Sequence, residues 1–161
     1  MKLTENFSLP ELLESNTATR LGLRDQFTPP QSVIDSLTDL CMHVLQPLRY
    51  GIDGPIKVSS GYRSPRLNAA VKGSSSSQHC KGEAADINYF KNGVEDNLTL
   101  AKKVLELELP FDQMILEFGT NNNPAWIHLS YSRKRQRNEI LRATLQQGRT
   151  IYTKVLKEDL I

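Results

Sequence analysis

The chain has 161 residues, of which 24% are charged and 39% apolar, and its formal net charge is +2. These values are typical of one globular domain, here expected over residues 1–161, and exclude a disordered or fibrous protein. The charge is too balanced for a nucleic-acid binder, and no apolar segment approaches the roughly 18 residues of a membrane span. Residues 1–7 lack the apolar core of a secretory signal, so we expect the protein to be cytoplasmic as synthesised.

Helical patterns dominate the first part of the chain. Pro10 after Ser8 indicates a short helix over 9–13, and residues 17–29 indicate an irregular segment. Together they suggest an N-terminal arm over 1–30, followed by a core over 31–155. Apolar residues at steps of three and four predict a longer helix over 31–49, whose last turn Pro47 should loosen.

Strand patterns follow. Alternating residues predict strands over 56–60, 84–89, 113–118 and 126–131, with short helices from Ser64 to Val71 and over 98–108. The last segments, 139–145 and 149–155, could form a hairpin that turns at Gln147-Gly148, and a helix over 139–147 is the alternative. The order of elements indicates an α+β fold, with a mostly antiparallel sheet that carries helices on one face.

One face of the predicted sheet collects polar side chains. Strand alternation places Asp86, Glu117 and His128 on this face and sends their apolar neighbours to the other. His79 precedes a turn at Gly82, and a loop that folds back onto its own strand would bring His79 to Asp86. Two imidazoles and one carboxylate suit zinc and leave a fourth position open, which is the catalytic arrangement.

Two further residues fit hydrolytic chemistry at such a zinc site. Glu117 could accept a proton from a zinc-activated water and pass it to the leaving group. Arg63, just after a predicted strand, is a fixed cation that could hold an oxyanion or a substrate carboxylate.

Three motifs together resemble the zinc D-Ala-D-Ala carboxypeptidase family, in its branch of short single-domain peptidases common in bacteria and prophages. They are Ser60-Gly61-Tyr62-Arg63-Ser64, Ser77-x-His79-x-x-Gly82-x-Ala84-x-Asp86 and Trp126-x-His128, and the resemblance spans about residues 7–155. It implies the Hedgehog/DD-peptidase fold, with the zinc site on the sheet face opposite the helices. It also implies one Zn²⁺ per chain, held by His79, Asp86 and His128.

The resemblance further implies an enzyme that cleaves D-amino-acid peptide bonds in peptidoglycan stem peptides, as a DD-carboxypeptidase or an endopeptidase. Arg63 would bind the oxyanion or a carboxylate, and we expect Ser77, Gln113 and Trp126 to contact substrate, Trp126 at the rim of the cleft. The site of action would be the cell wall or periplasm, reached by a phage-type release or another route. We expect a monomer without nucleic-acid or membrane partners.

The sequence departs from the family pattern at one point. Related dipeptidases carry an acidic base three positions before the last histidine, where this chain has Ala125. Glu117 on the neighbouring strand therefore inherits the role of base, with Asp112 and Glu83 as alternatives.

Other features have plainer interpretations. His43 lies off the apolar stripe of its helix and should be exposed, Cys41 and Cys80 should be free thiols, and Cys80 should point away from the metal. The basic run from Arg133 to Arg137 is expected to be solvated. A catalytically silent zinc-binding module, or a phage structural module of the same fold, is the alternative function.

Overall fold

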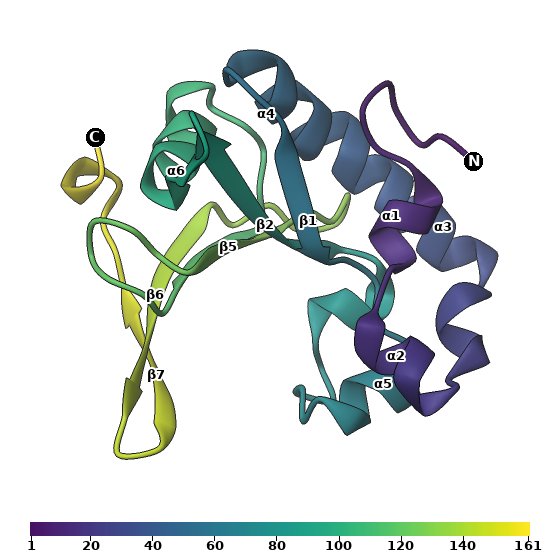
Figure 1. Ribbon diagram of the computed structural model, residues 1–161. Coiled ribbons are helices and arrows are strands. Elements are labelled where there is room, and N and C mark those ends of the chain that lie inside the picture. The colour runs from purple at the N-terminus through teal and green to yellow at the C-terminus, as the bar shows by residue number, and fades with distance from the viewer.

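The computed structural model describes all 161 residues (Figure 1). The helices are α1 Leu9–Leu13, α2 Asn16–Leu21, α3 Gln31–Leu40, α4 Gln46–Gly51, α5 Pro65–Ala70 and α6 Asn97–Glu106. Short helical turns are η1 Arg24–Phe27, η2 Cys41–Leu45, η3 Gln78–Lys81 and η4 Lys157–Asp159. The strands are β1 Ile56–Ser60, β2 Ala84–Lys91, β3 Val94–Glu95, β4 Gln113–Glu117, β5 Trp126–Ser130, β6 Glu139–Gln146 and β7 Arg149–Lys154.

The strands form one sheet in the order β1-β2-β5-β4-β6-β7, with β3 paired to β2. Every pairing is antiparallel except that of β4 with β6. The predicted α+β class and its mostly antiparallel sheet are therefore confirmed. Most residues of the predicted apolar rows are fully buried in one core with residues of α1, α3, α4 and α6; they include Ile87, Met114, Leu116, Ile127 and Leu129. Phe118, predicted in the same row, is only half-buried and packs on Trp126 instead.

The N-terminal segment is more regular than its sequence suggested. Residues 17–29 were expected to be irregular, but they contain most of α2 and all of η1. The Ser15 side chain caps α2 by accepting a hydrogen bond from the Ala18 N–H, and Gly22 ends the helix in the left-handed conformation. These short-range caps lie outside any apolar periodicity, which is why the helix was missed.

Gln26 joins this N-terminal segment to the rest of the fold. Its fully buried amide donates from Nε2 to the carbonyl oxygens of Leu13 and Tyr62, and its Oε1 accepts from the Ser64 N–H. Tyr62 and Ser64 flank Arg63, so the N-terminal segment holds the backbone that carries this cation.

The predicted helix over 31–49 is interrupted. A π-helical turn, η2, separates α3 from α4, and the Gln46 N–H donates to the Cys41 carbonyl five residues back. Pro47 has no N–H to give to the fourth carbonyl before it, so regular α-helical bonding cannot continue there. The prediction that Pro47 disturbs the helix is confirmed, but the disturbance begins a turn earlier than expected.

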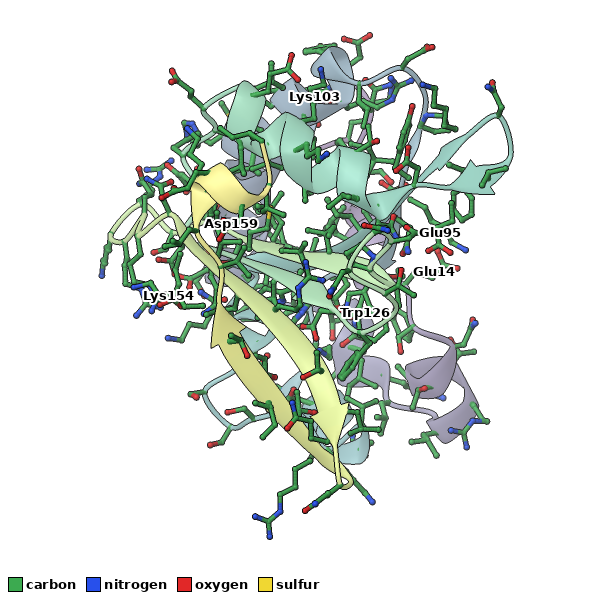
Figure 2. The ribbon with its side chains drawn as sticks, turned by 90° about the vertical axis from the view of Figure 1, so that its left-hand side faces the viewer. Glu14, Glu95, Lys103, Trp126, Lys154 and Asp159 are labelled. Atoms are coloured by element: carbon green, nitrogen blue, oxygen red, sulfur yellow. The ribbon has the colours of Figure 1, made fainter.

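The C-terminal segment is a hairpin, and the helical alternative over 139–147 is wrong. Gln147 and Gly148 both have positive φ, 49° and 76°, as a two-residue type I′ turn requires. The β6–β7 hairpin extends well beyond the rest of the sheet (Figure 1, Figure 2). No helix has both the length and the apolar character needed to cross a membrane.

Candidate active site

The three predicted metal ligands meet on the sheet face opposite the core. The register of β2 with β5 places Asp86 directly beside His128, and η3 folds back to bring His79 against both. His79 Nε2 lies 3.2 Å and His128 Nδ1 lies 3.3 Å from Asp86 Oδ1. One ligand atom from each of the three residues lies within 4.8 Å of the other two.

Gly82 produces the turn that returns η3 to the strand. Its φ is +72°, and a Cβ at this position would lie 2.7 Å from the carbonyl oxygen of Val33. A side chain here would combine left-handed strain with a clash against backbone, so the turn that positions His79 requires glycine.

The backbone fixes the orientation of the His79 ring. His79 Nδ1 lies 2.7 Å from the Gly61 carbonyl oxygen, which can only accept, so Nδ1 carries the proton. The lone pair is then on Nε2, the nitrogen that faces Asp86. Gly61 reaches this position because it packs against Leu12, whose carbonyl oxygen would lie 2.3 Å from any Cβ.

Gln78 fixes the orientation of the His128 ring. Its Nε2 donates to the Asp112 carboxylate at 2.8 Å, which leaves its Oε1 to accept from His128 Nε2 at 3.1 Å. The lone pair of His128 is therefore on Nδ1 and also faces Asp86. Gln78 directly precedes a predicted ligand, but its role depends on a contact 50 residues away and has no signal in the sequence.

This arrangement fits a divalent cation. Asp86 Oδ1 is buried and has no hydrogen-bond donor, although two imidazole nitrogens lie close to it. Burial alone would raise the pKa of Asp86, but the charge and hydrogen bonds of protonated His79 and His128 hold it below the ordinary value, so the carboxylate is charged. When both imidazoles are neutral, the lone pairs described above face this charged oxygen. Three lone pairs thus converge on one point, and the donor set of two nitrogens and one carboxylate oxygen suits zinc with an open position.

Glu117 lies in the same cavity, as the predicted register requires. It pairs with Trp126 across β4 and β5 and projects from the face that carries His128. Burial raises the pKa of Glu117 to about 7, reinforced by the negative charge of Asp86 and opposed by His128 and Arg63. A carboxyl group with this pKa can both accept and release a proton near neutral pH.

Arg63 enters the cavity from the segment after β1. Its backbone N–H donates to the His79 carbonyl oxygen at 3.1 Å, which joins the cation to the turn that holds a ligand. The guanidinium forms no salt bridge, and its buried Nε has no hydrogen-bond partner. Arg63 is therefore free to bind an anionic group of a substrate.

The two alternative bases are placed differently. Asp112 is fully buried and accepts hydrogen bonds from Gln78, Arg135 and Arg137, so its oxygens are occupied. Burial alone would raise the pKa of Asp112, but the bonds and charges of the two arginines hold it below the usual value. Glu83 lies in a different hollow, beside Tyr131 and Ser132.

The basic run differs in part from its predicted solvated state. Arg135 and Arg137 form ion pairs with the buried Asp112, so their guanidinium groups belong to the structure that supports Gln78. Arg133 is exposed and pairs with Asp39. The partner of Arg135 and Arg137 lies more than 20 residues away in sequence, and charge spacing could not reveal it.

The remaining predicted residues line a cavity of about 530 Å³ together with the ligands, Arg63 and Glu117. Ser77 Oγ accepts from the His79 N–H, and Gln113 Nε2 donates to Glu139. Trp126 packs on Phe118 with ring centroids 5.4 Å apart, and its buried Nε1–H has no acceptor. The cavity also contains Leu141 and Tyr152 of the C-terminal hairpin, which sequence reasoning missed.

His43, Cys41 and Cys80 lie outside the cavity, as the sequence predicts. His43 is exposed and stacks on Tyr131 with ring centroids 4.9 Å apart, and it does not line the cavity. Cys41 is buried, Cys80 is half-buried, and both are free. Cys80 is not among the residues that line the cavity.

Comparison with known proteins supports this interpretation of the site. A family model described as Peptidase M15 matches residues 5–130, a range that includes the three candidate ligands, Arg63 and Glu117. A comparison with individually curated proteins gives no match.

The first prediction concerns the metal. Protein purified without added metal should carry close to one zinc per chain, because two imidazoles and a carboxylate match zinc better than calcium or magnesium. His79→Ala and His128→Ala should lose it, whereas the exposed His43→Ala should not. Metal analysis that finds equal zinc in the three variants would contradict the ligand assignment.

The second prediction concerns Gln78. Gln78→Ala removes the acceptor that fixes the proton on His128 Nε2, so zinc affinity should fall about 10–100-fold while the fold is kept. Competition with a chelator dye measures this, and Gln31→Ala, an exposed glutamine on α3, is the control. Unchanged affinity in Gln78→Ala would show that the ring orients without its partner.

The third prediction concerns the pH dependence of the metal-free protein. Because the pKa of Glu117 is raised, the folded protein holds this proton more tightly than the unfolded chain does. The proton therefore stabilises the fold fully below about pH 4.5, and this stabilisation is lost as the pH rises through about 7. Glu117→Gln cannot ionise, so its Tm relative to wild type should increase from pH 5 to pH 8. The expected increase is about 2–4 °C for each kcal/mol of unfolding free energy that the wild type loses. Thermal unfolding in chelator measures this, with Glu83→Gln as control; a constant difference across pH would refute the burial of a charged Glu117.

Proposed function

The chain belongs to the peptidase M15 family of zinc metallopeptidases, and we propose that it hydrolyses D-amino-acid peptide bonds in peptidoglycan stem peptides. The observation that carries this proposal is the free cation and the free carboxyl group that share one cavity with the His79–Asp86–His128 cluster. A site that only stored a metal would not need an unpaired cation, Arg63, or an unpaired carboxyl group, Glu117, in the same cavity.

The residues divide the reaction between them. His79, Asp86 and His128 would hold the zinc, which when bound supplies Lewis acidity and lowers the pKa of water toward about 7. Glu117 takes the proton of the attacking water and delivers it to the leaving amine. Arg63 binds the developing oxyanion or the terminal carboxylate of the peptide.

The Lewis acid and the base are held by different parts of the fold. The ligands come from η3, β2 and β5, whereas Glu117 comes from β4. We propose that the enzyme acts on the cell wall as a monomer, as a DD-carboxypeptidase or an endopeptidase.

Purified protein incubated with muropeptides, with and without a chelator, tests this function by mass spectrometry of the products. Release of free D-Ala would indicate a carboxypeptidase, and cleaved cross-links an endopeptidase. Glu117→Gln should bind zinc and cleave neither, whereas Glu83→Gln, outside the cavity, should remain active. Absence of products from fully zinc-loaded wild type would overturn the proposal in favour of a binding or phage structural module.

The fourth prediction concerns Arg63. Arg63→Lys keeps the charge but loses the planar fork that binds a carboxylate or oxyanion through two N–H groups. The variant should keep its zinc and its Tm and lose about 10²–10³ in kcat/KM on a D-Ala-D-Ala peptide. Steady-state kinetics measures this, and activity close to wild type would show that Arg63 is structural.

A further inference from the structure

The C-terminal hairpin continues the cleft face of the sheet beyond the catalytic groups. Glu117 on β4 pairs with Ala143 on β6, and Ala143 pairs with Tyr152 on β7. Because paired residues project from the same face, Trp126, Glu117, Ala143 and Tyr152 form one row across four neighbouring strands. The row places an aromatic ring on each side of the carboxyl group.

Tyr152 has the environment of a binding residue without an internal partner. It lines the cavity that contains the metal ligands, yet it is 55% exposed and its hydroxyl forms no hydrogen bond. Burial and then the charge of Glu117 raise the pKa of the Tyr152 phenol, which agrees with its place in the same row as Glu117, beyond the small side chain of Ala143. An exposed, unpartnered aromatic ring beside a cleft is typical of a binding contact.

The hairpin forms one wall of the cavity and the segment after α5 forms the other. All residues from 71 to 77 except Ser75 line the cavity on the side of Arg63, whereas Leu141 and Tyr152 line it from the hairpin. Figure 1 shows α5 and the hairpin on opposite sides below the sheet. Arg63 and Tyr152 therefore mark the two ends of the cleft.

Strand spacing sets the distance from Trp126 to Tyr152 across the cleft. Neighbouring strands lie about 4.8 Å apart, so the three steps from β5 to β7 cover about 14 Å. An extended peptide advances about 3.3 Å per residue, and this distance corresponds to about four residues. A free dipeptide held at Arg63 and the metal cluster would end well short of Tyr152.

We propose that Tyr152 is a specificity residue, whose ring contacts the substrate on the N-terminal side of the scissile bond and favours longer stem peptides over free D-Ala-D-Ala. This inference rests on the proposed function and extends it to the length of the substrate. The hairpin lies beyond residues 5–130, the part of the chain that the family model matches.

Trp126 allows the proposal to be tested by binding alone. It is the only tryptophan of the chain and it lines the cavity, so its fluorescence reports on occupancy of the cleft. Zinc-loaded Glu117→Gln would be titrated with D-Ala-D-Ala and with the pentapeptide L-Ala-γ-D-Glu-L-Lys-D-Ala-D-Ala. The pentapeptide should bind about tenfold more tightly, as the added contact with one aromatic ring allows.

The same titrations on double variants identify the residue responsible. Adding Tyr152→Ala should remove most of the pentapeptide's advantage and leave dipeptide binding unchanged, whereas Tyr152→Phe should keep the advantage. Ile151→Ala is the matched control, because Ile151 is the neighbouring residue and projects from the other face of β7. Equal binding of the two peptides, or an advantage that survives Tyr152→Ala, would overturn the proposal.

Hydrolysis by the wild-type protein separates this inference from the proposed function. Length-dependent binding through Tyr152 without cleavage of either peptide would support the contact and overturn the enzymatic function. Cleavage of both peptides with a kcat/KM ratio that Tyr152→Ala does not change would support the function and overturn the contact.

Discussion

The pairing of Asp86 with His128 across β2 and β5 is the constraint on which the rest of the site depends. It places a buried carboxylate oxygen beside an imidazole lone pair, and the η3 turn adds a second lone pair from His79. No donor satisfies that oxygen, so the arrangement is unfavourable until a cation occupies the common point. The glycines at 61 and 82 serve this arrangement, because each allows a backbone approach that any side chain would block.

A second layer of charge keeps the catalytic groups free. Asp112 is as buried as the core residues, and Arg135 and Arg137 neutralise it, so its carboxylate can hold Gln78 and through it the ring of His128. These ion pairs engage Arg135 and Arg137 of the 133–137 run. Arg63 and Glu117 remain in the cavity as a cation and a carboxyl group without salt-bridge partners, which is the state that substrate binding and proton transfer require.

The part of this site that the sequence predicts is the part encoded by strand alternation. A period of two assigned Asp86, Glu117 and His128 to one face, because a slip of one residue would have buried their charges in the core. The functions of Gln78 and of Arg135 and Arg137 rest on partners 23 to 50 residues away, which no local pattern contains. Helix α2 was not predicted because a serine cap and a terminal glycine specify it, not an apolar period. The π-helical turn was not predicted because it is a response to the missing N–H of Pro47.

The two ends of the cleft differ in how extensively they are bonded to the rest of the fold. On the side of Arg63, Gln26 makes three buried hydrogen bonds that fix the backbone around the cation to the N-terminal segment and hence to the core. On the far side, β7 is exposed at every residue and contacts the sheet only through β6. The reacting groups need accurate positions, whereas a ring that contacts the more distant part of a peptide tolerates movement. In the proposed function, the fold thus places its most strongly bonded segments beside the reacting groups and its least buried strand beside the more distant part of the substrate.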